Sequence, residues 1–171
     1  MDLKAHIRTI PDFPQPGILF YDITTLLMNG EAFAHALDKL HKVVEDTKPD
    51  HIVAIESRGF LFGAPLAAVS KIGLVLVRKQ GKLPGAVINH TYDLEYGTDT
   101  IEISEGFIQP GNRVLIVDDL LATGGTAGAT KTLLENIGAE VVGTLCLIEL
   151  IWLKGRETVG GDVRSILTYE V

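Results

Sequence analysis

The chain has 171 residues, a single cysteine and a net charge of −7, from 15 Lys and Arg against 22 Asp and Glu. This length fits one domain that can fold without disulfides or a structural metal. The acidic balance argues against proteins that bind nucleic acid or anionic membranes, because such binding depends on local positive charge. With no signal-peptide core and no apolar run long enough to span a bilayer, we expect a soluble, cytoplasmic protein.

Helices and strands are predicted to alternate along most of the chain. A short helix is predicted over residues 3–10, and the prolines that follow it predict an extended segment. Apolar residues at helical spacing predict a helix over 31–46. Short apolar runs predict buried strands, with further helices between them. These strands are 51–55, 73–77, 113–117 and 140–150, and the helices are 60–70 and 123–137.

Buried strands that alternate with helices are typical of an α/β fold. In such a fold an open, mainly parallel sheet is covered by helices on both faces. Residues 83–108 break the pattern, because isolated apolar residues there stand among polar residues and glycines. This segment predicts a long hairpin or flap, and a segment of that length in a compact domain is more often functional than incidental.

The strongest chemical signal is an apolar strand that leads into two acids and a glycine-rich turn. Asp118 and Asp119 follow the strand, and a predicted helix follows the turn. Glycines let backbone amides approach a phosphate, threonines donate further hydrogen bonds, and a helix N-terminus adds partial positive charge. Open α/β sheets bind ligands at this end of their strands, so we predict a phosphate site. The residues of the turn are Ala122, Thr123, Gly124, Gly125 and Thr126.

Two familiar phosphate motifs do not match this turn. A P-loop needs a lysine directly after a glycine, but Lys131 follows Thr130 inside the predicted helix. The dinucleotide fingerprint needs a glycine right after the strand, where this chain has Asp118. An ordinary strand-to-helix turn with a capping threonine is the remaining alternative, and it accounts less well for two acids, two glycines and two threonines together.

Ser57 and Arg58 follow another predicted strand, 51–55, and therefore lie at the same edge of the sheet. Backbone amides in such a turn can hold a second phosphate, and Arg58 can bind it through two donors. The alternative is a surface turn with a local Arg–Glu pair, which contributes little to stability.

Three cations, Arg78, Lys79 and Lys82, follow the predicted strand 73–77. They suit a pyrophosphate group, although a run of charge is usually a solvated surface. The five histidines are scattered without metal-ligand spacing, so no metal site built from protein side chains is predicted.

The residues from 114 to 126 resemble the phosphoribosyl-pyrophosphate motif of the type I phosphoribosyltransferases. The resemblance implies that Asp118 and Asp119 meet the ribose hydroxyls and that the turn after them wraps the 5-phosphate. It implies a pyrophosphate loop at Ser57 and Arg58, where we expect a cis peptide between these two residues. It also implies a homodimer, and Mg²⁺ held mainly through phosphoribosyl pyrophosphate and water.

Further segments resemble the adenine-specific members of that family, which implies transfer of phosphoribose to adenine. Glu95 is then the implied general acid for the purine, with Arg58 as a second catalytic residue, and Tyr96 is a lid residue. Leu19 and Phe20 are the implied apolar contacts to the purine. These segments are 11–23, 92–97 and 153–157.

The resemblance implies one phosphoribosyltransferase domain over 1–171, with an N-terminal hood at about 1–30 and a flexible catalytic flap at about 79–108. Two other functions stay open. One is transfer to xanthine or hypoxanthine, whose 6-oxo groups would call for a hydrogen-bond donor near the base edge; Tyr21, which stands where relatives often carry Arg or Lys, leaves the strictness of base choice open. The other is a regulatory module that binds phosphoribosyl pyrophosphate without catalysing transfer.

Overall fold

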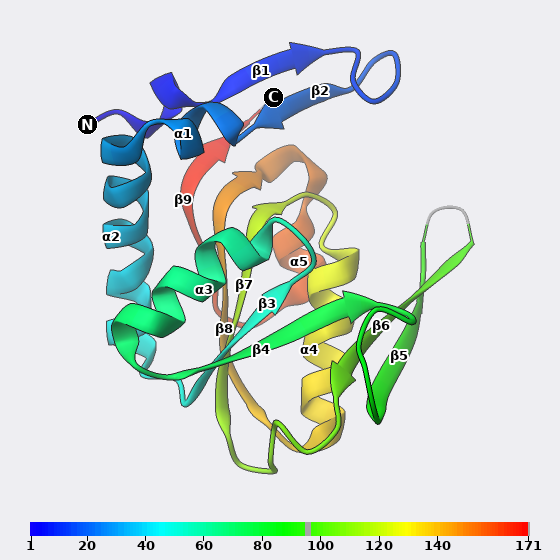
Figure 1. The fold of residues 1–171 in the computed structure, drawn as a ribbon. Coiled ribbons are helices and arrows are strands. Elements are labelled where there is room, and N and C mark those ends of the chain that lie inside the picture. The colour runs from blue at the N-terminus through cyan, green and yellow to red at the C-terminus, as the bar shows by residue number, and fades with distance from the viewer. Residues whose placement is uncertain (95–96, 171) are drawn as a thin grey trace. The chain divides into compact units, whose positions relative to one another are not determined.

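The computed structural model describes residues 1–94 and 97–170 (Figure 1). Their internal contacts divide the chain into two compact units, Met1–Lys39 and Leu40–Val171. Helix α2 (Gly30–Thr47) continues from the first unit into the second, and it confirms the helix that the apolar spacing predicted over 31–46. None of the described helices is long and apolar enough to cross a membrane.

The first unit contains a two-stranded antiparallel sheet of β1 (Arg8–Pro11) and β2 (Leu19–Asp22). A 3₁₀ helix, η1 (Leu3–His6), precedes this pair and α1 (Thr24–Met28) follows it. The helix predicted over 3–10 is therefore wrong beyond residue 6. Arg8 lies opposite Asp22 in the ladder and its Nε donates to Asp22 Oδ2 at 3.0 Å. This pairing with a distant segment replaces the bonds that a longer helix would make.

The second unit is built on a seven-stranded sheet with the order β5-β6-β4-β3-β7-β8-β9 (Figure 1). Its strands are β3 (His51–Ile55), β4 (Gly73–Lys79), β5 (Val87–Asp93), β6 (Thr98–Ser104), β7 (Arg113–Leu121), β8 (Glu140–Leu150) and β9 (Val163–Tyr169). Neighbouring strands along β4-β3-β7-β8-β9 are parallel. Strand β6 runs antiparallel to both β4 and β5. The mainly parallel sheet and the hairpin are both confirmed.

Helices cover both faces of this sheet, as the contacts of β3 show. Alternate residues of this strand point to opposite sides of the sheet. Ile52 and Ala54 lie under α3, where a Cβ built at Gly63 would meet both side chains. Val53 and Ile55 belong to the cluster of buried residues that includes the inner face of α4. The helices that follow β3 are α3 (Gly59–Ser70), α4 (Gly125–Ile137), η2 (Ile151–Leu153) and α5 (Gly155–Val159).

Strand β7 is longer than predicted, so Asp118 and Asp119 lie inside it rather than after it. On one side, β8 pairs with β7 as far as Leu121. On the other side, the ladder with β3 stops where Ala54 faces Val117. The two acids therefore begin where the neighbouring strand ends, at the carboxyl edge of the sheet where ligands bind in open α/β folds.

Candidate active site

The predicted phosphate loop forms the turn between β7 and α4. Gly124 adopts a left-handed conformation with φ of 82° at the start of α4, a backbone that favours glycine. The first amides of the helix have no intrahelical acceptor, and glycine offers no side chain to cap them. They border a cavity of about 120 Å³, far above the roughly 10–15 Å³ that one water requires. Its lining residues are Asp118, Leu120, Leu121, Ala122, Thr123, Gly124, Gly125, Thr126 and Ala127.

A second backbone segment supports this loop from behind. A Cβ built at Gly124 would overlap the carbonyl oxygen of Gly155, and one built at Gly155 would overlap the carbonyl oxygen of Ala122. Both positions therefore need glycine for the two segments to approach. Gly155 belongs to residues 153–157, which were singled out only by resemblance, and the structure gives this segment a role in shaping the phosphate loop.

Arg156 fixes the segment at Gly155, which lies behind the phosphate loop, to the sheet. Its Nε and Nη2 donate to the two carboxylate oxygens of Glu149, at 3.0 and 2.6 Å. Ser165 Oγ donates to the same carboxylate at 2.6 Å, so both oxygens of the buried acid have hydrogen-bond donors. The hydrogen bonds from Arg156 hold the pKa of Glu149 below its ordinary value. This two-pronged geometry joins the segment at Gly155 to β8.

Asp118 and Asp119 form a close pair at the edge of the cavity. The amide of Asp119 donates to Asp118 Oδ1 at 2.8 Å, and Arg58 Nε lies 3.0 Å from Asp119 Oδ2. Burial, together with the charge of Asp119, raises the pKa of Asp118 well above its ordinary value. Burial also raises the pKa of Asp119, and Arg58 opposes that shift. The pair is thus costly to ionise fully, and nearby positive charge would relieve that cost.

Ser57 and Arg58 lie between β3 and α3, as predicted. Ser57 is exposed, and Arg58 directly precedes the first residue of α3. The structure has a cis peptide between Glu56 and Ser57, so the cis bond expected between Ser57 and Arg58 is wrong by one position. The resemblance located the turn, but nothing in the residue types distinguishes its adjacent peptide bonds.

The cation cluster is held by an acid that the sequence did not single out. Arg78 and Lys79 belong to β4, which is longer than predicted because β6 pairs with its end. Glu56 accepts from Arg78 Nη2 at 3.0 Å and from the Lys79 amide at 2.8 Å, and the bond from Arg78 lowers the Glu56 pKa. Arg78 Nη1 also donates to the carbonyl of the exposed Lys82 at 3.3 Å. The three predicted cations therefore do lie together.

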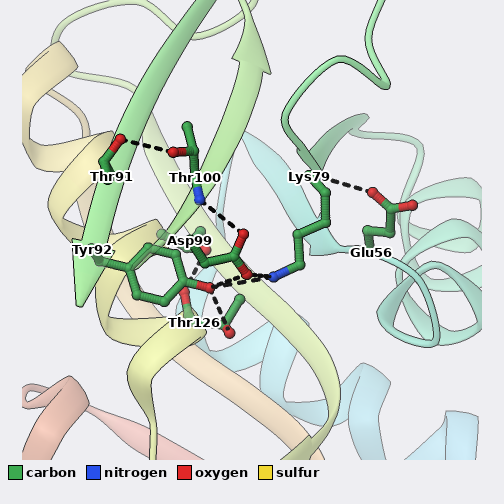
Figure 2. Close-up of polar contacts among 8 residues, drawn as sticks. Glu56, Lys79, Thr91, Tyr92, Asp99, Thr100 and Thr126 are labelled. Carbon is green, nitrogen blue, oxygen red and sulfur yellow. Dashed lines mark hydrogen bonds and ion pairs between the residues drawn. The ribbon is translucent and has the colours of Figure 1, made fainter. Parts of the chain in front are cut away.

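The β5–β6 hairpin joins this cluster to the phosphate loop (Figure 2). Lys79 Nζ forms an ion pair with Asp99 of β6. Tyr92 of β5 places its hydroxyl 3.0 Å from Thr126 Oγ1 and 3.3 Å from Asp99 Oδ2. Sequence reasoning gave Tyr92 and Asp99 no role of their own, because their partners lie in other segments and leave no local pattern.

The remaining predicted residues are not part of this described cluster. Glu95 and Tyr96 lie outside the described residues. Leu19 and Phe20 belong to β2 of the first unit, where the Phe20 ring meets the edge of Phe13 with centroids 5.0 Å apart. Within residues 1–94 and 97–170, no group of three or more His, Cys, Asp or Glu is placed to hold a metal ion.

Comparisons with known proteins agree with this geometry. The model of the phosphoribosyl transferase domain matches residues 22–159. The adenine phosphoribosyltransferase of Rhodospirillum rubrum is 55% identical over 170 residues, which are 99% of each chain. The chain belongs to the adenine phosphoribosyltransferase family.

Solved adenine phosphoribosyltransferases have the same fold. The enzyme from Thermoanaerobacter pseudethanolicus is 48% identical, with a TM-score of 0.94 over 98% of each chain. The Saccharomyces cerevisiae enzyme, complexed with D-2,5-dideoxy-2,5-imino-altritol 1,6-bisphosphate and adenine, is 41% identical, with a TM-score of 0.91 over 97% of each chain. The type I phosphoribosyltransferase fold expected for this chain is therefore confirmed.

Proposed function

We propose that this chain transfers the 5-phosphoribosyl group from phosphoribosyl pyrophosphate to N9 of adenine, forming AMP and pyrophosphate for purine salvage. The observation that carries this proposal is the cavity between Asp118 of β7 and the start of α4. It sits in a chain that matches adenine phosphoribosyltransferases along nearly its whole length.

The loop Ala122–Thr126 is proposed to hold the 5-phosphate. The residues at the start of α4 line the cavity, their amides have no intrahelical acceptor, and the helix dipole favours an anion there. The hydroxyls of Thr123 and Thr126 add two donors. Formal positive charge is not needed for this half of the substrate.

Asp118 and Asp119 are proposed to bind the ribose hydroxyls. As pyrophosphate departs, the anomeric carbon of the ribose gains oxocarbenium character while N9 attacks. Burial raises the pKa of both acids, and the charge of Asp119 adds to the shift of Asp118, so their joint negative charge is costly in the free protein. Positive charge developing on the ribose would compensate it, so this pair favours the transition state over the ground state.

Pyrophosphate is proposed to bind between the two strand ends that carry cations. Ser57 and Arg58 would contact it from the turn after β3, with Arg58 as a catalytic residue that stabilises the leaving group. Arg78, Lys79 and Lys82 would contact it from the end of β4 and the turn after it, where Glu56 already accepts from the Arg78 guanidinium and from the Lys79 amide. Much of the rate enhancement would then come from positioning and charge stabilisation.

The base is proposed to lie among residues contributed by other segments. Leu19 and Phe20 of the hood, at about 1–30, would contact the purine face, and Tyr96 would cover the site. Glu95 would manage a proton on the purine as N9 attacks. The flap, at about 79–108, would exclude water that could otherwise hydrolyse the activated sugar.

Magnesium is proposed as the cofactor, carried mainly by substrate oxygens and water. The donors present fit such an ion, because Asp118 and Asp119 are hard oxygen ligands, whereas the described residues hold no three-ligand cage. When bound, the ion would neutralise part of the charge on phosphoribosyl pyrophosphate.

We further propose a cytoplasmic homodimer with no nucleic-acid or membrane partner. The apolar residues Ile151, Trp152 and Leu153 are 45, 40 and 36% exposed, which is typical of residues that a subunit contact covers. Light scattering of the purified protein would give twice the chain mass of 18.5 kDa.

One assay tests the proposed reaction. The purified protein is mixed with Mg²⁺ and phosphoribosyl pyrophosphate, and pyrophosphate release is compared for adenine, hypoxanthine, guanine and xanthine. We expect release with adenine above the other bases. Release with xanthine or hypoxanthine instead would reassign the base. Binding without release for every base would make the chain a regulatory module.

A further inference from the structure

The hydroxyl of Tyr92 lies where the phosphate loop, Asp99 and Lys79 meet (Figure 2). It is 3.0 Å from Thr126 Oγ1, 3.3 Å from Asp99 Oδ2 and 3.5 Å from Lys79 Nζ. Thr126 also lines the cavity proposed for the 5-phosphate. Tyr92 therefore contacts the hydroxyl of a residue that lines that cavity.

Few protons are available for the hydrogen bonds around the Tyr92 hydroxyl. Lys79 can only donate, and the Asp99 carboxylate, whose pKa Lys79 lowers, can only accept. Tyr92 and Thr126 each have one hydroxyl proton and can do either. Tyr92 can therefore donate to Asp99 or to Thr126, but not fully to both. The choice that Tyr92 makes decides which way the Thr126 proton points.

A phosphate bound in the loop would determine whether Tyr92 donates to Asp99 or to Thr126. Phosphate oxygens only accept hydrogen bonds, so Thr126 must donate to the phosphate and accept from its other neighbour. We propose that Tyr92 is a positioning residue for the phosphate loop: its hydroxyl donates to Thr126 Oγ1 and directs the Thr126 proton at the 5-phosphate. This inference rests on the proposed phosphoribosyl transfer and adds a residue that the proposed chemistry does not use.

Asp99 is suited to release Tyr92, because Lys79 still neutralises its carboxylate. The Thr100 amide donates to Asp99 as well, at 2.8 Å. The acid therefore keeps two donors after the Tyr92 proton turns away. Loss of a third, longer bond is a small cost beside a new bond to a positioned donor.

The hydroxyl is not needed to hold the hairpin together. The ladder between β5 and β6 runs over seven residue pairs, and Thr91 and Thr100 bond across it at 2.8 Å. The Tyr92 ring packs against the buried cluster between the hairpin and α4. Tyr92→Phe keeps that ring and removes only the hydroxyl. Thr91→Val removes a hydroxyl from the same strand and serves as the matched control.

Calorimetry with ribose 5-phosphate and with phosphoribosyl pyrophosphate tests the inference without requiring turnover. We expect Y92F to weaken binding of both ligands about three- to tenfold, the effect of one lost hydrogen bond. T91V should stay within about twofold, and both variants should melt close to the unmodified protein. Unchanged affinity in Y92F, or an equal loss in T91V, would overturn the inference.

The double variant tests the route through Thr126. In a T126V background Y92F should have no further effect, whereas in T126S, which keeps the hydroxyl, it should act as it does alone. In the transfer assay Y92F should raise KM for phosphoribosyl pyrophosphate and leave KM for adenine and kcat within about twofold. A fall in kcat at constant KM would overturn the positioning role.

The two proposals fail in different ways. Ribose 5-phosphate binding that responds to Y92F, in a protein that transfers phosphoribose to no base, would overturn the proposed function and leave Tyr92 as a positioning residue. Normal transfer with adenine, and no response to Y92F, would overturn only the inference. A protein that binds neither ligand would overturn both.

Discussion

Gly155 lies against the carbonyl oxygen of Ala122 so closely that a side-chain carbon on Gly155 would overlap it. The contact joins the start of α5 to the loop between β7 and α4, two segments separated by more than thirty residues. The shape of the phosphate loop therefore depends on a backbone that touches no substrate in the proposed reaction.

Gly155→Ala should weaken binding of phosphoribosyl pyrophosphate about tenfold or more, because the new methyl group must displace the loop. Titration calorimetry measures the loss. Gly128→Ala is the control: a Cβ there meets its nearest atom, the Thr158 carbonyl oxygen, at an ordinary 3.5 Å, and alanine favours the helix. Equal affinities for the two variants would show that the close contact does not shape the site.

Arg156→Met should destabilise the fold by about 2–3 kcal/mol at pH 7. This lies below the usual cost of breaking a buried ion pair because the Arg156 side chain is half-exposed while Glu149 is buried. Urea unfolding measures it. Arg164→Met, which breaks ion pairs to the exposed Asp46 and Asp162, should cost less than about 1 kcal/mol.

The effect of Arg156→Met should depend on pH. The folded-state pKa of Glu149 is lowered, so the pair stabilises the fold fully above the unfolded pKa of about 4.3 and loses its effect as pH falls through the folded pKa. The difference between the two proteins should therefore shrink in acid. A difference that stays constant from pH 7 to pH 3 would mean that lost packing, not charge, is responsible.

Asp118→Asn should raise the melting temperature at pH 7, by about 2–4 °C, while it weakens substrate binding. The raised folded-state pKa of Asp118 means that its charge opposes folding: the penalty begins as pH rises above the unfolded pKa of about 3.9, is complete above the folded pKa, and disappears as pH falls below the unfolded pKa. The gain should therefore be largest at neutral pH and vanish in acid, as a pH series of melting curves would reveal. A lower melting temperature at pH 7 would contradict the assignment of a penalty to this charge.

Glu95→Gln should lower kcat by about 10²-fold or more, because a positioned general acid contributes about that much, and should leave the affinity for phosphoribosyl pyrophosphate nearly unchanged. Steady-state kinetics and calorimetry separate the two effects. Glu105→Gln, in the exposed turn after β6, is the control and should keep normal turnover. Normal turnover in the Glu95 variant would remove Glu95 from proton transfer.

The sequence predicted the parts of the fold that local patterns encode. β3 is predicted to the residue, because a short apolar run is bounded by polar residues on both sides. The ends of β4 and β7 are not, because their last residues pair with β6 and β8, which lie elsewhere in the chain. Strand β9 was missed, since its half-buried residues form no continuous apolar run.

The same distinction holds for the candidate site. The acids and glycines of the phosphate loop form one continuous motif, so they could be recognised from the sequence alone. The partners of the cations could not. Glu56 stands two residues from Arg58, yet it bonds Arg78 of the next strand, while Arg58 lies against Asp119. Whether a charged residue bonds its sequence neighbour or a residue of another strand depends on which strands are adjacent in the sheet.

Strand β3 lies between β4 and β7 in the sheet, although along the sequence these strands follow one another in the order β3, β4, β7. The turn after β3, the cations of β4 and the acids of β7 therefore come together only when pairings between distant segments are complete. Such non-local contacts form late and slowly during folding. A substrate that binds all three strand ends has little to bind before that point, so it would slow unfolding and leave the folding rate almost unchanged.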